Sequence, residues 1–203
     1  MLKIGITGGI GSGKTTICKV FEVLGVPVYY ADDASRQLLE NDKDVQHKVI
    51  AAFGEHVLDE TGRIARKKVA AVVFGNEEQL KKLNGIIHPA VALHFESWLK
   101  QHQQYFYILK EAAIMFESGA YLQLDKIITI TAPEQLRIAR VMKRDGTSKQ
   151  EIERRMKAQL PEEERIKRSQ FVIVNDEQEL VIPQIMEVHR RLLEANPNGL
   201  KNV

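Results

Sequence analysis

The sequence predicts an α/β protein: a parallel sheet flanked by helices, with a helical insertion and an arginine-rich helical lid. Three observations predict this fold. Short apolar segments alternate with helical patterns, a glycine-rich loop follows the first apolar segment, and two long helical stretches interrupt the alternation. Strands that alternate with helices form parallel sheets covered on both faces.

The core of the sheet is expected from residues 1–32, 104–136 and 169–203. Leu2 to Thr7 is apolar and leads into glycine, which is typical of a buried strand. A helix should run from Lys14 to about Leu24 and end at Gly25. Further strands are expected at 26–30, 105–110, 126–131 and 171–174, and the final residues, 194–203, are expected to fray.

The stretch 33–103 reads as almost wholly helical. Asn76 and Gln79 have the spacing of a helix cap, and apolar residues continue after them at helical spacing. A crossover between parallel strands needs only about a dozen residues, so this stretch predicts an inserted helical lobe. His88 precedes Pro89, which disfavours a helical conformation and predicts a break between two helices there.

The stretch 137–168 is crowded with charge. Ser148 and Glu151 have capping-box spacing, so much of this stretch should be helical. Two interpretations remain open: a solvated helix face, or a lid over a functional site. Arg140 and Arg144 are four residues apart, so both can face inward. The basic residues concerned are Arg137, Arg140, Lys143, Arg144, Arg154, Arg155, Arg165, Lys167 and Arg168.

Composition excludes several classes of function. The 203 residues carry 29 basic and 27 acidic side chains, a net charge of +2, which argues against a general nucleic-acid binder. Cys18 is the only cysteine, so an intrachain disulfide is impossible and a reducing compartment fits. We expect Cys18 to be a buried apolar residue. Because signal-peptide and membrane-spanning patterns are missing, we expect a cytoplasmic protein without a membrane partner.

Residues Gly8 to Thr15 match G-x-x-x-x-G-K-[ST], the phosphate-binding P-loop. The glycines allow positive φ angles and bring backbone N–H groups close to phosphate oxygens. Lys14 can reach the β- and γ-phosphates, and the Thr15 hydroxyl can ligate Mg²⁺. The sequence therefore predicts a P-loop fold that binds ATP or GTP with Mg²⁺. The expected ATP contacts within the loop are Gly11, Ser12, Gly13, Lys14, Thr15 and Thr16.

The loop alone leaves the reaction open, because switch proteins and motors share it. The guanine-reading N-K-x-D motif and a D-x-x-G switch after an apolar strand are both missing from the sequence. Asp32 and Asp33 instead follow the second expected strand, where a carboxylate can take the proton of an acceptor hydroxyl. One of them is expected to cap a helix and the other to act as the base. Arg36, four residues after Asp32, can share its helix face.

These residues resemble the dephospho-coenzyme A kinase family over nearly the full chain. The family's loop, T-G-G-I-G-S-G-K-[ST]-T, matches from Thr7 to Thr16. Its D-A-D has Tyr30 in place of the first aspartate, and its P-L-L-[FV]-E has Ala113 in place of the proline. Other matches are Ala31-Asp32, Ala34-Ser35-Arg36, Phe53-Gly54, Thr61-Gly62, Arg66, His88-Pro89, Phe116-Glu117, Arg140 with Arg144, and Asn175.

The resemblance implies phosphorylation of the ribose 3′-hydroxyl of dephospho-coenzyme A by ATP, the last step of coenzyme A biosynthesis. Asp32 would be the base, Lys14 and Arg140 would stabilise the transferring phosphoryl group, and Thr15 would hold Mg²⁺. The lobe 33–103 would bind coenzyme A, and 137–168 would be the lid with Arg140 and Arg144. Asn175 would lie near adenine, and the substrate contacts would be Asp32, Arg36, Arg66, His88 and Glu117. His88 can equally be a residue at the junction of two helices, satisfied by backbone, and Glu117 a backbone cap.

Two alternatives remain at this stage. One is a nucleoside or nucleotide kinase of similar layout, and the other is a nucleotide-dependent switch that transfers no phosphate.

Overall fold

A computed structural model describes residues 1–195; residues 196–203, which include most of the end expected to fray, lie outside the described residues. The chain divides into two compact units. The first contains residues 1–30 and the chain from residue 102 onward, and the second contains residues 31–101. Each unit is described by itself.

The first unit is built on a five-stranded sheet in the order β2-β3-β1-β4-β5, with every neighbouring pair parallel. The strands are β1 Leu2–Gly8, β2 Val28–Tyr30, β3 Tyr107–Glu111, β4 Lys126–Thr131 and β5 Phe171–Val174. The predicted parallel α/β sheet is therefore confirmed. The second strand is shorter than the expected 26–30, and the third is shifted from 105–110 toward the C-terminus.

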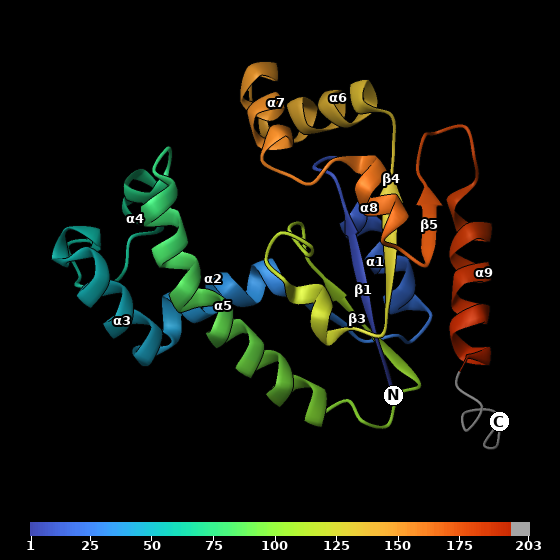
Figure 1. Cartoon of the computed structure of the whole chain (residues 1–203), viewed down its shortest axis with the longest axis horizontal. Coiled ribbons are helices and arrows are strands. Elements are labelled where there is room, and N and C mark those ends of the chain that lie inside the picture. Colours follow the sequence, from blue (N-terminus) through green and yellow to red (C-terminus); the bar gives the residue numbers. More distant parts are fainter. Residues whose placement is uncertain (196–203) are drawn as a thin grey trace. The chain divides into compact units, whose positions relative to one another are not determined.

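Both faces of the sheet are covered, because successive side chains of a strand point to opposite faces. Ile4 and Ile6 of β1 are fully buried in one core cluster with apolar residues of α1 (Lys14–Val23) and α9 (Val181–Glu194). On the opposite face, a Cβ added to Gly5 would lie 2.5 Å from the sulfur of Met115. Figure 1 shows α1 and α9 beside the strands of this unit.

Three helices occupy the charged stretch: α6 Glu134–Asp145, α7 Lys149–Lys157 and α8 Glu162–Lys167. Ser148 caps α7 through a bond from the Glu151 backbone N–H, as predicted. An apolar cluster of Ile138, Val141 and Ile152 packs α6 on α7, and Ile10 of the glycine-rich loop joins it.

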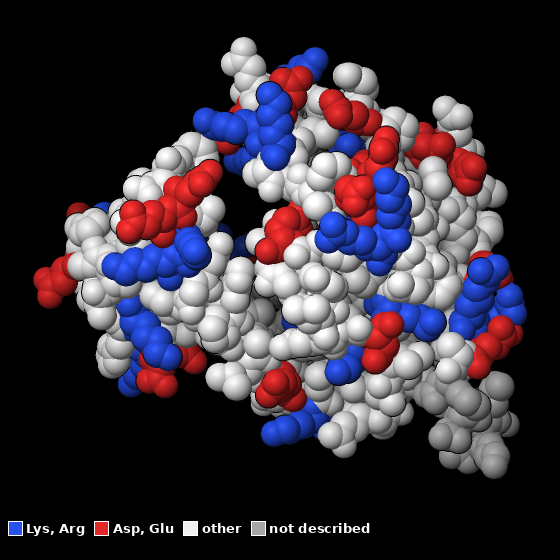
Figure 2. Space-filling model, viewed as in Figure 1, with Lys and Arg blue, Asp and Glu red and all other residues white. Residues whose placement is uncertain are grey.

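Much of the charge in this stretch lies on solvated helix faces, as one interpretation expected. Arg155 pairs with Glu151, and Lys167 pairs with Glu164, with the basic side chains 50% and 68% exposed. Figure 2 shows basic and acidic side chains interspersed on the face in view. Arg137 and Arg165 differ from this pattern, because they are only 6% and 3% exposed.

The second unit is helical, with a small antiparallel bridge between Leu58 and Ile64. Its elements are α2 Ala31–Asn41, α3 Lys43–Phe53, η1 Glu55–Val57, α4 Arg66–Val73 and α5 Glu77–Lys100. Its own apolar core holds these elements together. The buried members are Val45, Val49, Phe53, Val57, Ile64, Val69 and Ile87.

The predicted helix break at His88 is wrong. α5 runs through Pro89 from Glu77 to Lys100, with Asn76 accepting the cap bond from Gln79 at 3.1 Å as expected. The residue four before Pro89, whose carbonyl the proline ring would crowd, is Gly85. Buried apolar side chains hold the helix on both sides of the proline, at Ile87 and Phe95. Tertiary packing therefore outweighs the local preference of a residue before proline.

Among the helices of residues 1–195, none is both long and apolar enough to cross a bilayer.

Candidate active site

The glycine-rich loop joins the end of β1 to the start of α1. Gly11 and Gly13 have φ angles of 79° and 95°, which side chains of other residues adopt only with strain. A Cβ added to Gly13 would lie 2.3 Å from Nδ2 of Asn175. Glycine is therefore required at Gly13 both by the backbone conformation and by the close approach of Asn175.

The start of α1 is open to an anion. Within residues 1–195, no side chain caps this helix, so its first backbone N–H groups are available to phosphate oxygens. Lys14, its first residue, folds back and donates from Nζ to the Gly8 carbonyl oxygen at 3.0 Å. Thr15 and Thr16 follow in the first turn and are exposed. A lysine, backbone N–H groups without a side-chain cap and a threonine hydroxyl at one helix start are the chemistry of a triphosphate site.

Asn175 joins the last strand to the loop. Its backbone N–H donates to the Thr131 carbonyl at 2.8 Å, and its Nδ2 donates to the Ser12 carbonyl at 2.8 Å. Arg140 donates from Nη1 to the Asn175 carbonyl at 3.0 Å and pairs with Glu177 at 2.9 Å. The structure therefore brings Asn175 and Arg140 together beside the Ser12–Gly13 end of the loop.

Arg144 does not face inward with Arg140, so the expectation that both do so is corrected. Its side chain is 66% exposed and pairs with its neighbour Asp145 at 2.6 Å. Arg144 lies in the last turn of α6, where this adjacent carboxylate competes for the guanidinium. A spacing of four residues places two side chains on one face, but it does not say how far that face stays buried.

In the second unit, Asp32 and Asp33 lie in the first turn of α2, which begins at Ala31. The expectation that one of them is the cap residue is therefore wrong, although carboxylates there still favour the helix start. Arg36 pairs with Asp33 at 2.9 Å. Asp32 is exposed and lies two residues after the end of β2.

Other expected substrate contacts of the second unit lie on two of its helices. Arg66 begins α4 and pairs with Glu40 at 3.5 Å. His88 lies within α5, where partial burial lowers the pKa of its imidazole.

Tyr30, in place of the family's first aspartate, packs toward α1. The Lys19 ammonium lies 5.5 Å from the centre of its ring, and the side chain packs against the main core of the first unit. Burial raises the pKa of the Tyr30 hydroxyl, which stays protonated at neutral pH. The position thus contributes packing on the α1 side of the sheet.

Glu117 caps backbone, which was one of its two expected roles. Its Oε1 accepts from the Leu160 N–H at 2.6 Å. The adjacent Gln159 links two other segments: its Oε1 accepts from the Ile10 N–H at 2.9 Å, and its Nε2 donates to the Ala113 carbonyl at 3.2 Å. Sequence reasoning missed Gln159, because a lone glutamine between two helices forms no pattern.

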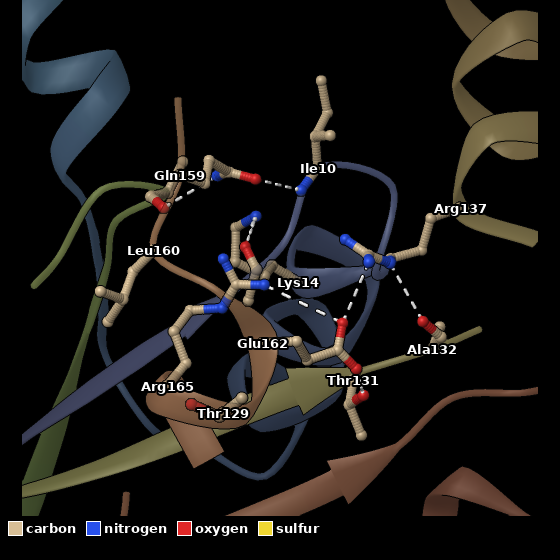
Figure 3. A network of polar contacts seen from close by, with 12 residues as sticks. Ile10, Lys14, Thr129, Thr131, Ala132, Arg137, Gln159, Leu160, Glu162 and Arg165 are labelled. Atoms are coloured by element: carbon tan, nitrogen blue, oxygen red, sulfur yellow. Dashed lines mark hydrogen bonds and ion pairs between the residues drawn. The ribbon is translucent and has the colours of Figure 1, made fainter. Parts of the chain in front are cut away.

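Sequence reasoning also left Arg137, Glu162 and Arg165 without a role, because they stood inside a charge run. Figure 3 shows the two arginines reaching Glu162 from opposite sides. The Glu162 carboxylate lies 3.1 Å from Arg137 and 3.9 Å from Arg165, and it accepts from the Thr131 hydroxyl. Only burial distinguishes these arginines from their exposed neighbours, and burial cannot be read from residue type.

Glu111 is a further acidic residue at the carboxyl edge of the sheet. It ends β3, pairs in register with Ile6 of β1, and is 6% exposed. Burial of the Cys18 thiol in α1 raises its pKa, the charge of Glu111 raises it further, and the charge of Lys14 opposes this. Glu111 shares the sheet face of Tyr107 and Leu109, which pack in one core cluster with residues of α1.

Comparisons with known proteins agree with this geometry. A family model described as dephospho-CoA kinase matches residues 2–180. A dephospho-CoA kinase of Bacteroides fragilis is 38% identical over 92% of this chain and 91% of the relative, and one of Aquifex aeolicus is 37% identical over 95% and 98%. A solved Thermus thermophilus structure is similar with a TM-score of 0.82 and 30% identity over 96% of this chain and 97% of that chain. A dephospho-CoA kinase structure from Campylobacter jejuni has a TM-score of 0.68 and 26% identity over 98% of both chains. With a phosphate loop, a parallel sheet and relatives of this similarity, the chain belongs to the dephospho-CoA kinase family.

Proposed function

We propose that this enzyme transfers the γ-phosphoryl group of ATP to the ribose 3′-hydroxyl of dephospho-coenzyme A, giving coenzyme A and ADP. The observation that carries the proposal is the loop between β1 and α1, with its positive-φ glycines, its uncapped helix start and Lys14 turned onto Gly8. This arrangement suits a triphosphate whose terminal group lies beside the lysine. The acceptor is taken from the family to which the chain belongs.

In the proposed reaction, the acceptor oxygen forms a bond to the γ-phosphorus while the bond from that phosphorus to the β–γ bridging oxygen breaks. The leaving group is ADP. Asp32 accepts the hydroxyl proton as the new bond forms. Lys14 and Arg140 balance the negative charge of the phosphates, and Asn175, beside Gly13, borders the nucleotide.

Mg²⁺ fits the oxygen donors near the start of α1. The Thr15 hydroxyl lies in the first helical turn, and the Glu111 carboxylate ends the neighbouring strand β3 and faces that helix. Mg²⁺ is usually held by one or two protein oxygens together with substrate phosphates, so these two groups suffice. When bound, the ion would neutralise charge that develops on the phosphates.

The remaining assignments follow from the same proposal. Residues 31–101 form a helical unit with its own core, which suits a separate lobe for the coenzyme A moiety. Arg36, Arg66, His88 and Glu117 are proposed substrate contacts, the last beside its role as a backbone cap. We place the enzyme in the cytoplasm, because the buried Cys18 is its only cysteine and both substrates are water-soluble metabolites.

An acceptor screen tests the reaction. The purified chain with Mg-ATP is offered dephospho-coenzyme A, adenosine, cytidine and nucleoside monophosphates, and ADP release is followed. We expect turnover with dephospho-coenzyme A and a product phosphorylated at the 3′-oxygen. Faster turnover with a nucleoside would instead favour a nucleoside kinase, and release of ADP without any acceptor product would favour a switch.

A pair of neighbouring variants tests the base. Asp32→Asn should keep ATP affinity within about threefold and lower kcat by about 10²-fold or more, because the amide cannot accept the proton. Asp33→Asn is the matched control: Asp33 pairs with Arg36 on the surface, with side chains 55% and 51% exposed, so its change should be small. Full activity in Asp32→Asn, or equal losses in both variants, would remove the base role from Asp32.

A further inference from the structure

Two buried arginines lie against the phosphate loop at Gly9. A Cβ added to Gly9 would lie 2.1 Å from Nη1 of Arg137 and 3.0 Å from Nη2 of Arg165. Arg137 reaches this place from α6 and Arg165 from α8. Their side chains are 7% and 3% exposed, so both charges have been taken almost completely out of water. Such burial is costly unless the charges are paired.

The Lys14 side chain also lies at the Gly9 end of the loop. The Lys14 ammonium donates to the carbonyl of Gly8, the residue directly before Gly9. A P-loop lysine serves the β- and γ-phosphates. The three cations therefore gather where the terminal phosphate would lie, whereas Arg140 and Asn175 lie at the Ser12–Gly13 end.

The pairing of these arginines is incomplete. Arg137 donates from Nε to the Ala132 carbonyl at 3.0 Å and pairs with Glu162 at 3.1 Å. Nη2 of Arg165 lies 3.9 Å from Oε2 of the same carboxylate, which is too far for a hydrogen bond. Its Nε and Nη1 have no hydrogen-bond partner among the described residues. Burial lowers the pKa of Arg165, although not enough to remove a charge of this kind at neutral pH. One carboxylate thus faces two buried guanidinium groups, which leaves an excess of positive charge.

The position of Arg165 is set by hydrogen bonds to the sheet. Its backbone carbonyl accepts from the Ser169 hydroxyl at 2.7 Å, and that hydroxyl lies 2.6 Å from the Thr129 hydroxyl of β4. Gln170 exchanges two bonds with the backbone of Ile127, at 2.8 and 3.0 Å. The helix that carries Arg165 is thereby held to β4, the strand next to the central strand β1. A group held in this way needs little rearrangement when an anion arrives.

We propose that Arg165 and Arg137 contact the γ-phosphate of bound ATP, and that Glu162 holds both guanidinium groups in place until the phosphate supplies the missing negative charge. This inference rests on the proposed kinase function and adds two catalytic residues to it. A γ-phosphate brings the oxygen acceptors that the free donors of Arg165 lack. The γ-phosphate contact thereby falls on a pair that differs from Arg140 and Arg144.

The experiment compares nucleotides with and without a γ-phosphate in Arg165→Met and Arg165→Lys. In Arg165→Met, the Kd for ADP should change by less than about threefold. The Kd for a non-hydrolysable ATP analogue should rise by about 10-fold. The kcat should drop by about 10³-fold, because the transition state loses the stabilisation that this arginine supplies. Arg165→Lys keeps the charge and should recover part of both losses. Lys167→Met, on the same helix but 68% exposed, is the control and should leave all three values near those of the unchanged enzyme.

Glu162→Gln supplies an independent measurement. Without the carboxylate, the two guanidinium groups lose their shared counter-ion, so the melting temperature should fall. The ATP analogue should then raise the melting temperature by more than it does in the unchanged enzyme, while ADP should not. The proposal is overturned if Arg165→Met weakens ADP and the ATP analogue equally, or if the analogue stabilises Glu162→Gln no more than the unchanged enzyme. Because binding and melting need no acceptor, failure of dephospho-coenzyme A as a substrate would leave these results unaffected.

Discussion

Gly9→Ala tests the close approach of Arg137 to the phosphate loop. Unlike Gly11 and Gly13, Gly9 does not have a positive φ angle, so its backbone conformation suits alanine. Only the added methyl group would meet an obstacle. The new Cβ would lie 2.1 Å from Nη1 of Arg137. An ordinary carbon contact is about 3.5 Å, so the guanidinium must withdraw by about 1.4 Å.

That withdrawal breaks the contacts that anchor Arg137. Its bond to the Ala132 carbonyl is 3.0 Å long and its ion pair with Glu162 is 3.1 Å long, and neither survives such a displacement. A charged hydrogen bond contributes about 1.5–3 kcal/mol. For a chain of this size, about 2–4 °C of melting temperature corresponds to each kcal/mol. The loss of both contacts, about 3–6 kcal/mol, should therefore lower the melting temperature of Gly9→Ala by about 6–24 °C.

A double-mutant cycle identifies the cause. Differential scanning calorimetry is run on Gly9→Ala, Arg137→Ala and the double variant. If the guanidinium is the obstacle, Gly9→Ala should cost less than about 0.5 kcal/mol once Arg137 is removed, because the two changes share one contact. Gly85→Ala is a control for adding a methyl group, since a Cβ there meets nothing within 4 Å. A Gly9→Ala cost that is equal in both backgrounds would refute the reasoning.

Two further predictions concern buried titratable groups. Burial raises the pKa of the Cys18 thiol, so fewer than about one chain in ten should react with a disulfide reagent at pH 8, against one thiol per chain in urea; rapid labelling of the folded chain would contradict this. Burial lowers the pKa of Lys110 to about 8. Between pH 8 and about 10 the unfolded chain therefore holds more protons at this residue, so the free energy of unfolding should gain up to about 1.4 kcal/mol per pH unit from it. Urea denaturation at pH 8, 9 and 10 should show this rise in the unchanged chain relative to Lys110→Met, and parallel curves would exclude it.

Patterns that depend on local spacing were predictable from the sequence. The strands at 126–131 and 171–174 have the expected bounds, and the caps at Asn76 and Ser148 form as expected. Each rests on neighbouring residues alone: an apolar run between turns, or a short polar side chain three residues before the N–H that it accepts. The parallel sheet follows from the order of such segments.

Features that depend on distant packing were not predictable. Pro89 lies inside α5, where apolar side chains are buried on both sides of it, at Ile87 and Phe95. Arg137 and Arg165 resemble Arg144 and Arg155 in the sequence, yet the first two are buried at the loop and the last two face water. Residue type and periodicity are alike in these cases, so only the three-dimensional arrangement separates a phosphate-facing arginine from a solvated one.

The Ser169 hydroxyl, just after α8, joins this helix to β4. Thr129, Ser169 and the Arg165 carbonyl form a chain of short hydrogen bonds, and Gln170 continues it along the backbone of Ile127. α6 and α7 pack on each other through a small apolar cluster that Ile10 of the glycine-rich loop joins. The charged stretch is therefore held in two ways: α8 by hydrogen bonds to β4, and α6 by its apolar contact with the loop and by the ion pair of Arg137 with Glu162.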